Sequence, residues 1–375
     1  MLSDNLIYKS YYNWWKNINK TVLILIIILF GLGLFFSLVS TSLIASDKLN
    51  TNSYYFFIKH LLFIVTGVFF IIFFSSLKND DLIKVSRLFF ILFLFFLILV
   101  PFFGVEVKGS KRWIEVPFLP RFQPIELLKP FLIVILASVL SYENKKNLYY
   151  KFFLSFLILT PIILLLIIQP DVGQTLLTFL TWLSLIFVSG INLVIFFVFL
   201  VLLCFLLVGA IYLFPNKFGY ILTRLQSFFD PTSGNNYQSE KASEAIISGG
   251  FFGKGIGEGT LKNRVPEAHT DYIVSVISEE FGVLFIIILM IIFLFFVYQV
   301  FKKLYSEDNN QSKLILVGSM SIILLQALIH IGVNIRLFPT TGMTLPFISY
   351  GGSSIVSTSI LSGIILNLTK RRIDY

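Results

Sequence analysis

Apolar residues fill this chain in continuous runs of about 20, the length that crosses a hydrocarbon core of roughly 30 Å as an α-helix. Short polar stretches separate the runs. Because the runs do not alternate apolar with polar residues, a transmembrane β-barrel is excluded. The pattern predicts an all-α, polytopic membrane protein with ten transmembrane helices, at residues 21–42, 56–77, 86–104, 124–141, 150–168, 173–190, 191–214, 273–301, 312–335 and 346–368.

One polar interruption, residues 215–272 between predicted helices 7 and 8, is much longer than the others. Loops beyond about 12–15 residues without structure of their own are usually functional or disordered. This loop is dense in glycine, aromatic and charged residues, so we expect a working surface. The chain then divides into an N-terminal segment (1–20), a membrane domain (21–368) and a C-terminal tail (369–375).

The distribution of Lys and Arg between the two sets of helix ends predicts the orientation, because short cytoplasmic loops carry the excess. Long loops are discounted, since they cross the membrane largely regardless of charge. Both termini are therefore predicted to be cytoplasmic and the 215–272 loop extracytoplasmic. The richer ends carry Lys9, Lys16, Lys20, Lys78, Lys84, Arg87, Lys145, Lys146, Lys151, Lys302, Lys303, Lys313, Lys370, Arg371 and Arg372.

Composition agrees with a membrane protein: 57% of the 375 residues are hydrophobic and 43 are Phe. The net charge of +9 follows mostly from the topological bias, which argues against a nucleic-acid partner. The only cysteine, Cys204, lies within an apolar run, so no internal disulfide can form.

A cationic cluster precedes the fourth predicted helix. Four cations and Trp113 suit a phosphate or pyrophosphate head group, because Arg presents a planar fork to phosphate oxygens. The alternative is an outer aromatic belt with snorkelling cations. Glu126 and Lys129 share one face of the helix, where charge inside a span favours function over an ordinary ion pair. The cations are Lys108, Lys111, Arg112 and Arg121, and Gln123 lies between them and Glu126.

Two other segments favour structural roles. In the turn at 169–175, Asp171 is well placed as the N-cap of the next helix. The glycine run at 248–257 is not a P-loop, because Gly255 stands where Ser or Thr is needed, and no strand precedes it. These glycines are expected to permit tight turns and close backbone approach to substrate or to a neighbouring helix.

The segment 265–272 closes the long loop with Glu267, His269 and Asp271. Asp271 suits either chemistry or a helix cap. His269 is expected to orient or pack rather than bind metal, since no second His or Cys lies nearby. Glu279 and Glu280 would lie roughly 12–14 Å further along the helix, either facing a wet cavity in the membrane or in a part of the helix that protrudes outward.

Pro and Gly residues in the segment 339–354 are expected to break the last span near its outer end. Irregular backbone at membrane depth is tolerated where it lines a cavity or is buried in protein. Close helix packing through small residues explains residues 351–354 equally well.

These segments resemble the SEDS family of FtsW, RodA and their relatives, over about residues 14–368. The motifs that carry the resemblance are KGSKRWI, RFQPIELLK, QPDVGQ, VPEAHTDYI and LPFISYGGSS. Ala268, where RodA-like sequences tend to carry Arg, and the TGMTLPFISYGGSS run are more similar to the FtsW branch. Gln174 departs from the Thr common in the family.

The resemblance implies a peptidoglycan glycosyltransferase that polymerises lipid II into β-1,4-linked strands from an undecaprenyl-pyrophosphate-linked glycan. It implies a plasma-membrane enzyme at the division septum, working with a class B penicillin-binding protein (an FtsI-like transpeptidase) and other divisome proteins. The proposed catalytic aspartate of the family falls on Asp271. Other positions that are implicated in activity in the family fall on Arg121, Glu126 and Lys129, with Lys111, Arg112 and Trp113 beside them. We add Gln123, Glu267 and His269 as substrate-binding candidates.

Other functions remain open at this stage. A lipid II flippase would use the same cations but needs a hydrophilic path between the two faces, and a non-catalytic division scaffold needs no acid beside the cations. A RodA-type elongation polymerase would share the chemistry. No cofactor is firmly implied, although a divalent cation such as Mg²⁺ would suit a pyrophosphate leaving group.

Overall fold

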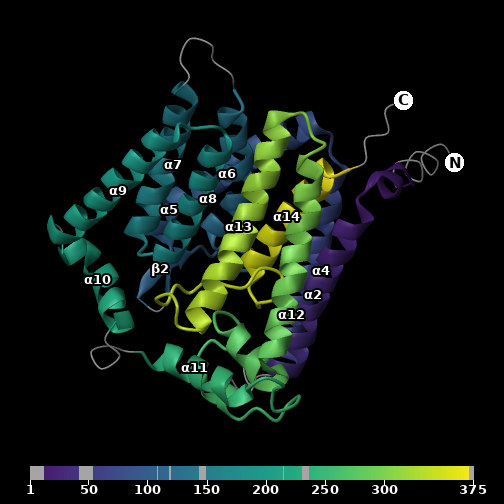
Figure 1. The fold of residues 1–375 in the computed structure, drawn as a ribbon, viewed down its shortest axis with the longest axis vertical. Helices are drawn as coiled ribbons and strands as arrows, with labels where there is room; N and C mark the ends of the chain where they lie inside the picture. Colours follow the sequence, from purple (N-terminus) through teal and green to yellow (C-terminus); the bar gives the residue numbers. More distant parts are fainter. Residues whose placement is uncertain are drawn as a thin grey trace.

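The computed structural model describes residues 12–41, 54–107, 109–117, 120–142, 149–213, 215–229 and 236–370. Helices lie side by side as a bundle, and each of the ten predicted spans contains one of them (Figure 1). The long helices are α2 (Lys20–Phe36), α4 (Tyr55–Ser76), α5 (Asn79–Phe103), α6 (Pro124–Leu140), α7 (Tyr150–Ile168), α8 (Val172–Val188), α9 (Leu193–Leu213), α12 (Ile273–Leu304), α13 (Asn310–Asn334) and α14 (Gly352–Leu368).

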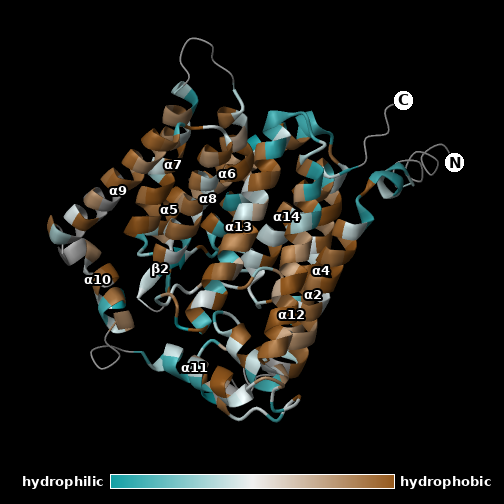
Figure 2. Ribbon diagram, in the orientation of Figure 1, coloured by the Kyte–Doolittle hydropathy of each residue, from teal (hydrophilic) through white to brown (hydrophobic). Residues whose placement is uncertain are grey.

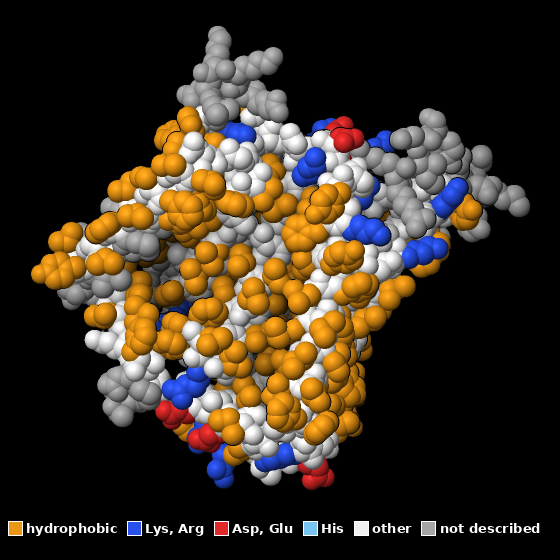
Figure 3. Space-filling view, in the orientation of Figure 1, with side chains coloured by type: hydrophobic (Ala, Val, Ile, Leu, Met, Phe, Trp, Pro, Cys, Tyr) orange, Lys and Arg blue, Asp and Glu red, His pale blue; other side chains and the backbone are white. Residues whose placement is uncertain are grey.

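The outside of the bundle is apolar. Among the described residues, six helices are long and apolar enough to cross a membrane (α2, α4, α5, α7, α12 and α13), and three shorter apolar helices accompany them. Large apolar side chains point outward along these helices, including Phe69, Ile91 and Ile291, each more than half exposed. Charged side chains gather at the two ends of the bundle (Figures 2 and 3). The chain is therefore a multi-pass membrane protein, because only lipid suits such a surface.

Three inner helices, α6, α13 and α14, form the centre of the bundle, and nearly every residue of α14 is buried. Small residues bring α14 close to α4. A Cβ at Gly67 would collide with the Ser359 hydroxyl, and one at Gly363 would meet Phe74. Along α14 the Thr358 hydroxyl donates to the Ser354 carbonyl oxygen and the Ser362 hydroxyl donates to the Thr358 carbonyl oxygen, which satisfies both hydroxyl donors without water. This packing through small residues is typical of membrane helices.

The expectation of an all-helical chain is wrong in one place. An antiparallel hairpin, β1 (Val105–Val107) and β2 (Ser110–Trp113), precedes α6, with Val107 opposite Ser110. Gly109 takes a φ of +77° in its turn, a conformation that glycine adopts without strain. An isolated bridge between Ile114 and Phe122 extends the pairing. The hairpin gives the cationic segment a defined shape. Lys108 lies outside the described residues.

The polar stretch 215–272 also has more structure than expected. It contains α10 (Pro215–Phe229), α11 (Tyr237–Gly249) and η2 (Leu261–Arg264). Its glycines lie against the start of α12, where a Cβ at Gly249 or Gly253 would collide with the backbone of Ser278 or Glu280. The predicted close backbone approach to a neighbouring helix is thereby confirmed.

The last predicted span begins later than expected. Residues 346–351 form irregular backbone and α14 starts at Gly352. The predicted break at the start of this span is confirmed, and residues of the broken segment line the cavity described next.

Candidate active site

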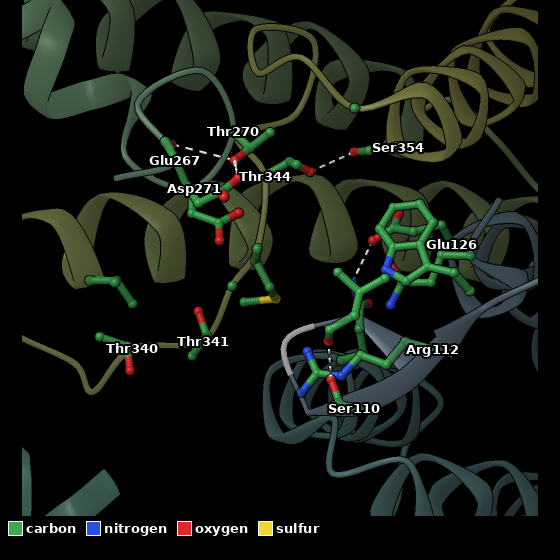
Figure 4. Close-up of a pocket in the computed structure, with 18 of the residues that line it drawn as sticks. Ser110, Arg112, Glu126, Glu267, Thr270, Asp271, Thr340, Thr341, Thr344 and Ser354 are labelled. Atoms are coloured by element: carbon green, nitrogen blue, oxygen red, sulfur yellow. Dashed lines mark hydrogen bonds between the residues drawn. The ribbon is translucent and has the colours of Figure 1, made fainter. Parts of the chain in front are cut away.

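A cavity of about 560 Å³ lies at the end of the bundle that carries the hairpin, α10 and the segment before α12. Five parts of the chain that are distant in sequence supply most of its lining. These are the hairpin, the start of α6, the turn before α8 with the first residues of that helix, residues 267–272 and the segment 340–354. Helices α10, α11 and α13 add Arg224, Gln238 and Val333. Figure 4 shows Asp271 and Glu267 on one side of the cavity, with Arg112 and Glu126 on the other.

Arg112 is held in the cavity wall by the turn between α7 and α8. Its guanidinium donates to the carbonyl oxygens of Gln169 (3.4 Å) and Pro170 (2.5 Å) and lies 3.7 Å from the Asp171 carboxylate. A planar cation fixed in this way is pre-organised to bind phosphate oxygens.

Asp171 has the predicted capping role and a second one. Its carboxylate accepts from the Gln174 N–H at the start of α8 and from the Gln123 side chain at 3.0 Å. Burial raises the pKa of the Asp171 carboxyl, while the nearby Arg112 guanidinium and the Gln174 N–H oppose that rise. The residue therefore joins the hairpin, α6 and α8 at the cavity wall.

Glu126 and Lys129 form a buried ion pair at the start of α6, with 2.9 Å between Lys129 Nζ and Glu126 Oε2. Glu126 lines the cavity, whereas Lys129 lies behind it and donates to the Gln326 side-chain oxygen at 3.2 Å. The Gln174 side chain donates to the other Glu126 oxygen. Two glutamines from other helices thus satisfy this pair inside the bundle, as buried charges require.

The Gln326 amide continues this network to the opposite wall. It donates to the Thr344 carbonyl oxygen at 2.9 Å, and the Thr344 hydroxyl donates to Ser354 at 2.7 Å. Thr344 and Ser354 both line the cavity. Gln326 therefore connects Lys129 to the irregular segment that precedes α14.

Asp271 lies immediately before α12 and its side chain points into the cavity (Figure 4). The N-cap of α12 is Tyr272, one residue later, so Asp271 does not occupy the cap position. The backbone here is fixed: the Asp271 carbonyl oxygen accepts from Asn334 at 3.1 Å, and the Glu267 carbonyl oxygen accepts from the Tyr272 N–H at 3.2 Å. Burial, with the Asp271 carboxylate adding to its effect, raises the pKa of Tyr272, which keeps its hydroxyl protonated.

The segment 340–354 faces Asp271 and is tied to the same backbone. Ser349 donates to the Thr270 carbonyl oxygen at 2.7 Å, and the Tyr350 N–H donates to the His269 carbonyl oxygen at 3.0 Å. Gly342 has a φ of +69°, and its Cβ position would lie 3.6 Å from an Asp271 carboxylate oxygen. The absence of a side chain at Gly342 leaves room beside that oxygen.

The structure brings six of the ten predicted site residues to the cavity: Arg112, Trp113, Gln123, Glu126, Glu267 and Asp271. Four others do not line it. Lys129 lies behind Glu126, and the His269 ring packs against Phe56 and Tyr350. Lys111 is exposed, and Arg121 pairs at 2.9 Å with Glu115 on the surface, both side chains being more than half exposed.

Several lining or supporting residues were missing from the predicted set. Gln174 and Gln326 lie in predicted spans, where a polar side chain is a usable signal. Arg224 of α10 lines the cavity and donates to the Thr340 carbonyl oxygen at 3.3 Å, but a lone surface cation gives no sequence signal.

No group of three or more His, Cys, Asp or Glu side chains that could hold a metal occurs in the described part of the chain. Asp271 and Glu267 are the carboxylates of one wall. Mg²⁺ commonly needs only one or two carboxylates when substrate phosphates supply the remaining ligands. These two residues would fit that arrangement.

Comparison with known proteins agrees with the resemblance. The model of the FtsW/RodA/SpoVE cell cycle proteins matches residues 20–373. A probable peptidoglycan glycosyltransferase FtsW from Coxiella burnetii is 34% identical over 96% of this chain and 98% of the relative. One from Caulobacter vibrioides is 31% identical over 96% of this chain and 91% of the relative.

Solved structures share the fold. A structure of a peptidoglycan synthase complex, described as coordinating polymerization and crosslinking, contains a chain with a TM-score of 0.79 and 24% identity, matching 94% of this chain and 97% of that one. RodA, the rod shape determining protein of Thermus thermophilus, gives a TM-score of 0.68 at 23% identity, matching 94% of this chain and 96% of the other. This chain belongs to the FtsW/RodA/SpoVE family of cell cycle proteins.

Proposed function

We propose that this chain is a peptidoglycan glycosyltransferase that polymerises lipid II during septal cell-wall synthesis. The observation that carries the proposal is the cavity itself, where the Asp271 carboxylate faces a wall that contains Arg112 and Glu126, with Lys129 paired to Glu126 behind that wall. A carboxylate for the sugar hydroxyl and a cation for the pyrophosphate are the two groups that this reaction needs. The names of the FtsW relatives support the same activity.

In the proposed reaction, Asp271 acts as the general base. It takes the proton from the GlcNAc 4-hydroxyl of lipid II as that oxygen attacks the anomeric carbon of the glycan strand. The bond between that carbon and the pyrophosphate oxygen breaks, its electron pair leaves with undecaprenyl pyrophosphate, and the α-linkage becomes β-1,4. General base catalysis contributes typically about 10²–10⁴-fold, and the developing charge on the sugar resembles that of a glycosidase transition state.

The cationic wall would stabilise the leaving pyrophosphate. Arg112 is the direct candidate because it lines the cavity with its guanidinium held in place. Lys111 and Arg121 would approach the head group from the surface. Trp113 and Gln123 line the same wall, and Lys129 would act through Glu126 rather than by contact. A divalent cation carried by the pyrophosphate would be held by Glu267, while Asp271 acts as the base, and would neutralise developing charge.

We further propose ten membrane crossings, cytoplasmic termini and an extracytoplasmic cavity, as the charge distribution predicts. The partner would be a class B penicillin-binding protein of the FtsI type, together with other divisome proteins. The likeness to a chain of a peptidoglycan synthase complex supports a transpeptidase partner. The division role rests on the FtsW relatives, and a RodA-type elongation role is the alternative.

The test is to incubate the purified chain with labelled lipid II, both in vesicles and together with a class B penicillin-binding protein. Glycan strands that lengthen with time are the expected product. Transbilayer movement of lipid II without polymer would identify a flippase, and neither outcome in the presence of the partner would identify a scaffold. Either result would overturn the proposal.

A further inference from the structure

Four apolar side chains lie exposed at the end of α11 and in the glycine-rich turn that follows it. Their exposed fractions are high: Ile247 76%, Phe251 71%, Phe252 83% and Ile256 60%. These residues lie outside every predicted span and line no part of the cavity. We call them the apolar tip. A cluster of large exposed apolar residues beside a membrane span marks a contact surface.

The backbone fixes the apolar tip against one level of α12. The Val283 N–H donates to the Gly250 carbonyl oxygen at 3.0 Å, and the Leu284 N–H donates to the Phe251 carbonyl oxygen at 3.2 Å. Gly282, with a φ of +80°, leaves no room for a Cβ between these two segments. The tip therefore lies at the level of residues 282–284.

The length of α12 places that level relative to the membrane. The helix ends with Lys302 and Lys303 at the opposite end of the bundle. Counting about 20 residues back from Lys302, at about 1.5 Å each, covers the roughly 30 Å of hydrocarbon and reaches Gly282. The outward face of α12 is apolar from this level onward, beginning with Leu284 and including Ile291. The tip thus continues the lipid-facing surface at its outer boundary.

Glu279 and Glu280 lie just beyond this boundary and are almost completely buried. Their carboxylates accept from the backbone N–H groups of Leu261 at 2.9 Å and Gly257 at 3.3 Å. The helix is interrupted at Gly282 (φ +80°), so residues 273–281 are not a straight extension of the span, and both predicted alternatives for these glutamates stay predictions. The same hydrogen bonds join the turn that bears the tip to the segment leading into residues 265–272.

We propose that the apolar tip inserts into the outer leaflet, with Phe251 and Phe252 at the boundary between head groups and acyl chains. Aromatic side chains favour this depth. Because Glu279 and Glu280 join the turn to α12, the inserted tip fixes the position, along the membrane normal, of the loop that ends at Asp271. The catalytic carboxylate is thereby held at the level of lipid head groups.

Site-specific fluorescence quenching tests this proposal. The single cysteine is removed as Cys204→Ser, and an environment-sensitive fluorophore is attached to Phe252→Cys in phosphatidylcholine vesicles. Bromine atoms on the lipids, placed either near the head group or near the end of the acyl chain, quench a fluorophore at the same depth. Iodide quenches a fluorophore that is exposed to water. Ile291→Cys, about 13 Å further along α12, is the buried-in-lipid control. Glu244→Cys, exposed on α11, is the aqueous control.

The expected result is loss of fluorescence at position 252 in lipid brominated near the head group, together with protection from iodide relative to position 244. The label at position 291 should respond most to bromine near the chain end. A label at position 252 that iodide quenches as fully as at 244 would place the tip in water. Protection from iodide and from both lipids would place it against protein. Each of these two results overturns the proposal, and neither depends on glycosyltransferase activity.

Discussion

Two pairs of charged residues near helix starts, Glu126 with Lys129 and Glu279 with Glu280, have opposite surroundings. The first pair lies inside the bundle, where an ammonium, a carboxylate and two glutamine side chains satisfy one another. The second pair has like charges, and its partners include backbone N–H groups and Lys254. The pairs look alike as charges in predicted spans, but only the first reaches the cavity. Whether a charged residue belongs to the functional site or only supports the fold therefore depends on where its side chain lies and which groups it contacts. The presence of a charge in a predicted span does not decide it.

The largest stability loss is expected for Lys129→Ala. Removing the ammonium leaves the Glu126 carboxylate buried without its charge partner, which costs about 3–5 kcal/mol. The measurement is the unfolding free energy in detergent, compared with the double variant Glu126→Gln/Lys129→Met. The double variant should recover most of the stability but not the polymerase activity. Full activity in the double variant would show that the pair serves the fold alone.

Glu279→Ala should cost less, about 1.5–3 kcal/mol, because hydrogen bonds to a charged group are lost but no unpaired charge remains inside the bundle. The readout is the unfolding free energy together with the rate of lipid II polymerisation. For each kcal/mol of unfolding free energy lost, the polymerisation rate should fall less in Glu279→Ala than in Lys129→Ala. An equal or larger fall in rate would contradict the distinction between the two pairs.

Gln326→Leu should cost about 1–2 kcal/mol. The hydrogen bonds to the Thr344 carbonyl and hydroxyl oxygens are lost, and Lys129 loses its neutral acceptor but keeps Glu126. As a positioning residue that joins Lys129 to Thr344, it should lower kcat more than it raises KM for lipid II. Steady-state kinetics give the two constants, and Gln326→Glu, which keeps an acceptor for Lys129, should restore part of the rate. A change confined to stability would show that the residue only packs.

The smallest effect is expected for Lys254→Ala, the matched lysine variant of the second pair. Its ammonium lies 3.8 Å from Glu279, and its side chain is 37% exposed. The carboxylate of this pair is buried, but it keeps its hydrogen bond from the Leu261 N–H when the partly exposed ammonium is removed, so the expected loss is about 0–1 kcal/mol. Thermal unfolding in detergent should therefore resemble that of the unaltered protein. A loss of stability comparable with that of Lys129→Ala would show that the two lysines contribute equally to the fold.

The sequence was sufficient to locate a helix in each of the ten apolar ranges, because hydrophobic length alone determines which segments can span a membrane. It also identified Asp271, Glu126 and Arg112, since charges are rare in such a chain. It did not predict the β1–β2 hairpin or helix α11, whose short polar sequences have no strong period. Helix α10 was not predicted either, although its apolar residues follow a clear helical period that would have revealed it.

The roles of single polar residues inside spans were harder to predict. Gln326 was overlooked because one amide in an apolar helix does not indicate its partner, and Lys129 lies 197 positions away in the chain. Glu279 could not be assigned a depth, because its burial depends on Gly249 and Gly253 packing against α12. Such contacts between distant segments follow from tertiary packing, and the local sequence pattern does not predict them.

The most direct test of the central claim is the initial rate of lipid II polymerisation by Asp271→Asn, measured beside Glu244→Gln, an exposed carboxylate of α11 outside the cavity. We expect the rate of Asp271→Asn to fall about 10²–10⁴-fold, the usual contribution of a general base, with membrane insertion unchanged. The rate of Glu244→Gln should stay near that of the unaltered protein. A rate for Asp271→Asn within a few-fold of the unaltered protein would contradict the assignment of this carboxylate as the base.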